Sequence, residues 1–126
     1  MGERRHRSGE AGERIAARFL RKKGYRILQR NYACPAGEMD LIALNGGRIV
    51  FVEVKSRESD AFGPPESRVN RAKQGRLSRV ALEYLRRHNL HDASCRFDVV
   101  SILHPASRDP VIEHFQEAFP LRIGRY

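Results

Sequence analysis

Residues 37–57 read GEMDLIALNGGRIVFVEVKSR, a pattern that is typical of a β-hairpin. Two apolar runs, 38–44 and 48–56, are joined by Asn-Gly-Gly, which is typical of a tight turn between antiparallel strands. Charged residues are embedded in these runs: Glu38, Asp40, Glu53 and Lys55. Strands that break the local apolar pattern in this way often preserve a function.

Three registers of this hairpin give different neighbours. With a turn at residues 46–47, Asp40 lies opposite Glu53, and Glu38 lies opposite Lys55. With a turn one residue earlier, Glu38 opposes Glu53 instead. A third register lies between these two, shifted by one residue from each. It puts Asp40 and Glu53 on opposite faces, where they cannot form a joint site. We expect the first register.

Strand alternation then predicts which side chains share a face. The sets are Glu38, Asp40 and Ile42 in the first strand, Phe51, Glu53 and Lys55 on one face of the second, and Val50, Val52 and Val54 on the other. Carboxylates that face each other destabilise a hairpin by a few tenths to about 1 kcal/mol. A divalent cation relieves this repulsion, and Mg²⁺ prefers oxygen ligands. Two alternatives stay open: a solvated Glu-x-Lys ion pair, and metal binding without catalysis.

Composition limits the class of partner. The chain has 126 residues, 24 Lys+Arg against 15 Asp+Glu, a net charge of +9 and 40% hydrophobic residues, which fits one globular domain. The basic residues concentrate in 4–30 and 68–87, which favours a polyanion, first nucleic acid and second an anionic membrane surface. No apolar run is long enough for a membrane span, and the first residues do not resemble a signal peptide. We expect a cytoplasmic protein.

The periodicity predicts helices and strands in an α-β-β-β-α-β-β order. The expected elements are a helix over 9–23 with Ser8 as N-cap, a strand over 25–30, the hairpin strands 38–44 and 48–56, a helix over 68–88, and strands over 96–103 and 111–115. The segment NYACPAG is expected to be irregular, and residues 1–8 to form a basic flexible tail before a domain over 9–126. Asp98 is expected to pair with Arg96 or to cap a loop. The order implies a single α/β (α+β) domain, a mixed sheet of about five strands flanked by helices.

The acidic residue on one strand and Glu-x-Lys on the next resemble the PD-(D/E)xK signature of restriction-endonuclease-like nucleases. More closely, GEMDLIAL, FVEVKSR, the early GERIA and the late RFDVV resemble the YraN family, which is similar in fold to Holliday-junction resolvases. The resemblance covers about residues 9–119. It implies a restriction-endonuclease-like fold, a metal-dependent activity on DNA, and a homodimer.

The resemblance also implies roles for individual residues. Asp40 and Glu53 would bind Mg²⁺ or Mn²⁺, together with the Val54 carbonyl, and Lys55 would be the catalytic lysine. Glu13, at the edge of the first helix's apolar stripe, falls where related nucleases place a further acidic residue near the metal. From the residues alone, a first-turn acid that favours the helix dipole explains Glu13 equally well.

One departure from the broad pattern is that Met39, not proline, precedes Asp40. Glu38 is characteristic of the YraN group, and we expect it to pair with Lys55 or to help hold a second ion. Lesser candidates for nucleic-acid contacts are Arg57, Lys73 and Gln74; a lysine that only snorkels along the helix is the alternative for Lys73.

These observations lead to a first hypothesis, an Mg²⁺- or Mn²⁺-dependent endonuclease that binds DNA, including branched DNA, and hydrolyses phosphodiester bonds. The second hypothesis is a nucleic-acid-binding module of nuclease fold without catalysis. The third is a factor whose basic face binds an acidic protein.

Overall fold

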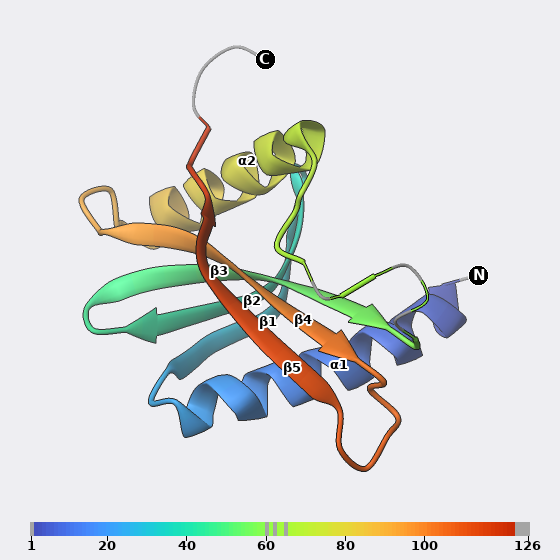
Figure 1. Ribbon diagram of the computed structural model, residues 1–126. Helices are drawn as coiled ribbons and strands as arrows, with labels where there is room; N and C mark the ends of the chain where they lie inside the picture. Colours follow the sequence, from blue (N-terminus) through green and yellow to red (C-terminus); the bar gives the residue numbers. More distant parts are fainter. Residues whose placement is uncertain (1, 60, 62, 65, 123–126) are drawn as a thin grey trace.

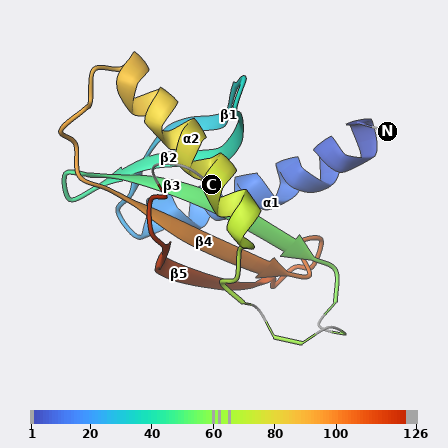
Figure 2. The same cartoon turned by 90° about the horizontal axis from the view of Figure 1, so that it is seen from above.

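The computed structural model describes residues 2–59, 61, 63–64 and 66–122. Its elements are α1 (Gly2–Lys22), β1 (Arg26–Cys34), β2 (Gly37–Asn45), β3 (Arg48–Arg57), α2 (Arg71–Arg87), β4 (Cys95–Leu103) and β5 (Val111–Phe119). The five strands form one sheet in the order β1-β2-β3-β4-β5 (Figure 1). Neighbouring strands are antiparallel except β3 and β4, which run in the same direction (Figure 2). The predicted single domain with a mixed sheet and flanking helices is confirmed, and it is consistent with a nuclease-like fold.

The helices cover opposite faces of the sheet because residue faces alternate along β3. Val50 and Val52 pack with Ala16 and Leu20 of α1, whereas Phe51 packs in the cluster that contains the apolar face of α2. Figure 1 shows α1 and α2 on the two sides of the sheet. The alternation predicted for β3 is therefore confirmed.

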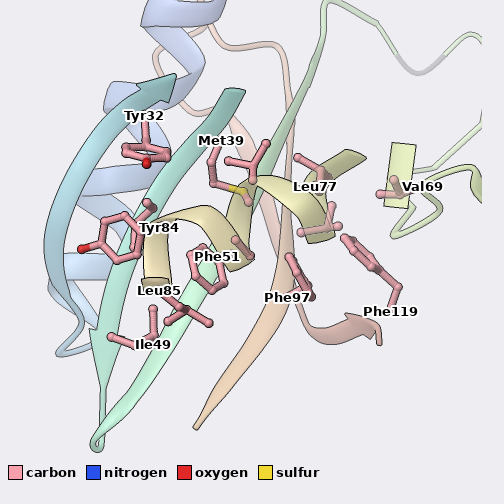
Figure 3. Packing of buried hydrophobic residues seen from close by; sticks show 14 residues of the cluster. Tyr32, Met39, Ile49, Phe51, Val69, Leu77, Tyr84, Leu85, Phe97 and Phe119 are labelled. Atoms are coloured by element: carbon pink, nitrogen blue, oxygen red, sulfur yellow. The ribbon is translucent and has the colours of Figure 1, made fainter. Parts of the chain in front are cut away.

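The core under α2 is rich in aromatic side chains. The Tyr84 ring of α2 meets Tyr32 and Phe51 edge to face, with centroid distances of 5.3 and 6.0 Å. Phe97 stacks on Phe119 at 4.7 Å (Figure 3). Such pairs contribute about 0.5–1.5 kcal/mol beyond burial. This packing joins α2 to residues from both edge strands of the sheet, Tyr32 of β1 and Phe119 of β5.

Several predicted boundaries are wrong. The first helix begins at Gly2, so Ser8 lies within it and does not cap it; the Arg- and Glu-rich start of the chain favours helix. The flexible tail over 1–8 stays a prediction. Much of NYACPAG is strand, since β1 continues to Cys34. The second helix begins at Arg71 and not at 68, because Asn70 is its N-cap and accepts a hydrogen bond from the Lys73 N–H at 2.8 Å.

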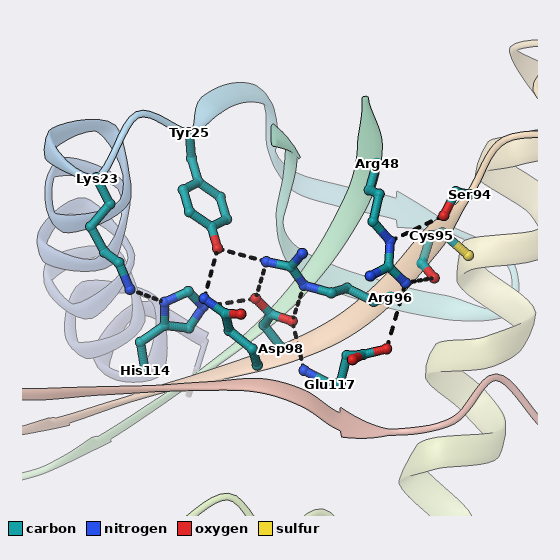
Figure 4. Close-up of polar contacts among 10 residues, drawn as sticks. Lys23, Tyr25, Arg48, Ser94, Cys95, Arg96, Asp98, His114 and Glu117 are labelled. Carbon is teal, nitrogen blue, oxygen red and sulfur yellow. Dashed lines mark hydrogen bonds and ion pairs between the residues drawn. The ribbon is translucent and has the colours of Figure 1, made fainter. Parts of the chain in front are cut away.

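A buried polar network joins β4 to β5 (Figure 4). Asp98 is fully buried and accepts hydrogen bonds from Arg96 Nε (2.9 Å), His114 Nε2 (2.7 Å) and the Glu117 N–H (3.1 Å). Arg96 also donates to the Tyr25 hydroxyl at 2.6 Å. Burial opposes ionisation of Asp98, but the hydrogen bonds from His114 and Arg96 lower its pKa below the ordinary value. The predicted pair of Arg96 and Asp98 is confirmed.

Candidate active site

The predicted hairpin register is confirmed. Asn45 pairs with Arg48 around the turn, and the ladder continues to Leu41 and Val52. Gly46 and Gly47 have φ values of +58° and +83°, a conformation that glycine adopts without strain. The turn therefore sets which residues of β2 and β3 come close together.

From the turn back along β2, the pairing with β3 stops at Leu41, the residue next to Asp40. Its Oδ2 accepts a hydrogen bond of 2.8 Å from the Val54 N–H, so a carboxylate takes the place of a strand carbonyl. Met39 and Ile42 both pack toward α2, whereas strict alternation would put Asp40 on the Ile42 side. The predicted shared face of Glu38, Asp40 and Ile42 is thus wrong, because β2 changes its alternation where Asp40 turns toward β3.

Asp40 lies in an electrostatically unfavourable place for a carboxylate. Burial and the nearby charge of Glu53 raise its pKa to about 8; the Val54 hydrogen bond opposes this, and Glu13 adds to it. Near neutral pH, Asp40 therefore holds a proton unless a cation neutralises the group. Asp40 and Glu53 are close neighbours, as predicted, although they do not form a regular strand pair.

Glu13 reaches the same place from α1. It is buried, and its Oε1 has no hydrogen-bond partner in the described part of the chain. Burial raises its pKa, while hydrogen bonds with Asn31 and Asp40 and the charge of Arg30 oppose the rise. The helix comes very close to β3 here, since a Cβ at Gly12 would clash with the Ser56 Oγ. This close approach brings Glu13 to the two carboxylates of the hairpin.

The two lysines differ in their contacts with Glu53. Lys73, from the first turn of α2, forms a short hydrogen bond and ion pair with Glu53 Oε2. Lys55 instead donates to the Arg68 carbonyl and lies 3.9 Å from Glu66 Oε1. Burial lowers the pKa of Lys55, while the charges of Glu66 and Glu53 oppose this. In this conformation Lys73 is the lysine of the carboxylate cluster.

A cleft of about 830 Å³ contains this cluster. Its charged lining residues are Glu10, Glu13, Glu38, Asp40, Glu53, Lys73 and Arg76. Glu38 is exposed, and the expected pair with Lys55 is absent among the described side chains. Of the three predicted nucleic-acid contacts, only Lys73 lines the cleft. Gln74 donates to the Val69 carbonyl and accepts from Arg122, so it holds protein segments together.

The oxygen atoms of the cluster are of the kind that a hard divalent cation prefers as ligands. The carboxylates of Glu13, Asp40 and Glu53 are neighbours, and no described residue forms a hydrogen bond with the buried Glu13 Oε1. The Val54 carbonyl faces β2 as well, because the N–H and C=O of a strand residue point to the same side. Over the described ranges, no group of three or more His, Cys, Asp or Glu side chains is already arranged around a metal position. Lys73 supplies the positive charge at Glu53 instead.

The site also contains residues that were not predicted, among them Glu10, Gly12, Asn31 and Arg76. Asn31 has a φ of +53° inside β1, and it opposes the rise in the pKa of Glu13. A single Asn in a strand-like segment is a weak signal for a left-handed residue. Arg76 follows Lys73 by three residues and therefore shares its side of α2; this spacing could have identified it.

The fold and the site define a class, a single-domain α+β protein with a carboxylate-rich cleft at the end of a β-hairpin. The family model "Uncharacterised protein family UPF0102" matches residues 12–102. The chain belongs to this family, and the resemblance to the YraN family is confirmed. None of the helices described is long and apolar enough to cross a membrane.

Curated relatives are similar in sequence to this chain over most of its length. A UPF0102 protein of Geotalea daltonii is 47% identical over 113 residues, which cover 90% of this chain and 89% of the relative. One of Syntrophus aciditrophicus is 48% identical over 120 residues, 94% of this chain and 93% of the relative. One of Moorella thermoacetica is 50% identical over 98 residues, 78% of this chain and 82% of the relative. The similarity to these three relatives therefore extends over 78–94% of this chain.

Proposed function

We propose that this protein is a metal-dependent endonuclease that binds DNA, including branched DNA, and hydrolyses phosphodiester bonds. The observation that carries the proposal is the meeting of Glu13, Asp40 and Glu53, from three different elements, in one cleft. Three buried or half-buried carboxylates repel one another, and this costs stability unless a cation or a proton is present. This loss of stability is explained if the carboxylates bind a divalent ion, which in turn binds a phosphate.

Glu13, Asp40, Glu53 and the Val54 carbonyl would hold Mg²⁺ or Mn²⁺. When bound, such an ion neutralises charge on a phosphoryl oxygen and activates water. The ammonium of Lys73 would then leave Glu53 and bind a phosphate oxygen. Lys55 would orient the attacking water, since it shares the Glu53 face of β3.

The charge distribution supports a nucleic-acid substrate. The chain carries a net charge of +9, although its cleft is lined by more acids than bases. Basic residues outside the cleft would hold the phosphodiester backbone while the acids act on one phosphate. Arg57 remains a proposed contact of this kind.

A panel of labelled linear, nicked, flapped and four-way DNAs with Mg²⁺ or Mn²⁺ tests the proposal. The parent should cut at least one substrate, and Asp40→Asn should lose cleavage while it keeps binding. Glu113→Gln is the matched control, because Glu113 is exposed on β5 outside the cleft lining. A parent that cuts none of these DNAs with either metal would refute the proposal.

One observation favours a second candidate, a nucleic-acid-binding module without catalysis. Lys73 already neutralises Glu53 within the protein, so the cluster has a cation without any metal ion. In that case the parent and Asp40→Asn would both bind DNA, neither would cut it, and Mg²⁺ would leave the melting temperature unchanged. Metal-dependent stabilisation that requires Asp40 would exclude this candidate.

A further inference from the structure

A second hollow, of about 450 Å³, lies along α1 and is lined by side chains of one charge. Its charged members are Arg14, Arg18, Arg21 and Arg30, and the remaining lining is Ala11, Ile15, Ala17 and Pro105. Among the residues that the structure describes, no acidic side chain lines it. The hollow thus has the opposite charge character to the carboxylate cleft.

Helical spacing explains why three of the arginines lie together. Arg14, Arg18 and Arg21 are separated by four and three residues, so they project from one side of α1. Ala17 and Leu20 point from the same helix into the core. Arg30 joins the group from β1, where it pairs with Leu41, a residue of the core beneath α1.

None of the four arginines forms an ion pair within the described part of the chain, and all four are exposed. Arg86 and Arg87 of α2, in contrast, both pair with Glu83. Like charges gathered in one concave place repel one another, and an anion removes this repulsion. Guanidinium groups are well suited to phosphate, because they donate two parallel hydrogen bonds to its oxygens.

Arg30 connects the hollow to the cleft. Arg30 lines the hollow, whereas the next residue of β1, Asn31, lines the cleft. Along α1, Arg14 likewise lines the hollow and its neighbour Glu13 lines the cleft, so the two sites lie next to each other. A single extended polyanion can therefore contact both, whereas a small anion would occupy only one.

We propose that the Arg14–Arg18–Arg21–Arg30 hollow binds backbone phosphates of the nucleic acid whose scissile phosphate enters the carboxylate cleft. This inference rests on the proposed function for the identity of the ligand and extends it by a second contact region. The contacts are to phosphate, so they add affinity without sequence preference.

The test measures DNA binding by the whole chain without added divalent metal. Fluorescence anisotropy gives the affinity over a range of salt concentrations. Arg18→Ala/Arg21→Ala is compared with Arg79→Ala/Arg86→Ala, which removes the same charge from exposed positions of α2 on the other side of the sheet. The slope of log affinity against log salt should become shallower by about 1.8 in the α1 variant, since each phosphate contact contributes about 0.9. The α2 variant should keep the parent slope.

Equal slopes for the two double variants would overturn the inference, because the effect would then be one of net charge. The inference would also be wrong if inorganic phosphate shifted the Arg18 and Arg21 side-chain N–H signals in NMR spectra while DNA binding did not depend on these residues. Failure of the proposed function is a separate result. Even if the parent binds DNA without cutting it, Arg18→Ala/Arg21→Ala can still show a shallower salt slope than the parent.

Discussion

The backbone N–H of Val54 donates a 2.8 Å hydrogen bond to Asp40 Oδ2, at the point where β2 and β3 stop pairing. The Asp40 carboxylate thus accepts the hydrogen bond that a backbone carbonyl accepts in a regular sheet, and this bond holds it between the two strands. Glu53 and Glu13 approach the same group from β3 and α1. The end of the hairpin is therefore a site at which acidic groups are concentrated.

The stability of the protein should depend on pH through Asp40. Its folded pKa is raised from 3.8 to about 8, so between these values the folded state binds more protons than the unfolded state. The free energy of unfolding then falls as pH rises through this window. Asp40→Asn does not titrate, so its stability relative to the parent should increase from about pH 5 to about pH 8, by roughly 1 kcal/mol or more.

Urea unfolding of both proteins at the two pH values, without divalent metal, measures this difference. The Glu113→Gln control should follow the parent at both. A difference between Asp40→Asn and the parent that does not change with pH would contradict the assignment of a raised pKa to Asp40.

Divalent metal should stabilise the parent near pH 8. An ion that binds only the folded state raises the melting temperature according to its concentration and affinity. Mg²⁺ or Mn²⁺ should raise the melting temperature of the parent and of Glu113→Gln, and leave Asp40→Asn and Glu53→Gln unchanged. Equal increases in all four proteins, measured by differential scanning calorimetry, would mean that the ion binds elsewhere.

Lys73 should matter for stability through Glu53. The carboxylate of Glu53 is largely buried, with a side-chain exposure of 9%, while that of Lys73 is 42%. Lys73→Met should therefore lower the free energy of unfolding by about 1 kcal/mol, a modest value because one partner is well exposed to water. Mg²⁺ should restore part of this loss.

Lys22→Met removes an exposed lysine of α1 and is the matched control. It should have almost no effect on urea unfolding. If the two variants unfold alike, the Lys73–Glu53 pair does not stabilise the fold.

The network around Asp98 should be purely structural. Asp98→Asn would leave the Arg96 guanidinium, whose side chain is 9% exposed, without its counter-charge. Breaking a buried pair in this way costs about 3–5 kcal/mol. Thermal unfolding should show this large loss, whereas the DNA affinity of the remaining folded protein should be unchanged; a variant as stable as the parent would contradict the importance of the network.

The sequence predicted the parts of the site that depend on local geometry. Asn-Gly-Gly indicated a turn and allowed three registers, and the register that we expected, which brings Asp40 near Glu53, is the one observed. It could not predict the shift in alternation at Asp40, because that shift follows from a side-chain bond to the Val54 backbone. The choice between Lys55 and Lys73 as the partner of Glu53 depends on how α2 packs over β3, which is a tertiary contact.

Glu13 illustrates the same limit. Its place at the edge of an apolar stripe indicated the sheet-facing side of α1, but its position beside Asp40 depends on the close approach of Gly12 to Ser56. Likewise, the arginine hollow needs Arg30 of β1 beside α1, which no spacing in the sequence shows.

The most direct test of the central claim is the rate of DNA cleavage under single-turnover conditions with Mn²⁺ or Mg²⁺, on the best substrate of the DNA panel. The parent and Glu113→Gln should cut at equal rates, and Asp40→Asn should be slower by about 100-fold or more, the size of effect typical of losing one group that stabilises transition-state charge. An Asp40→Asn protein that cuts as fast as the parent would show that the carboxylate cluster is not the catalytic site.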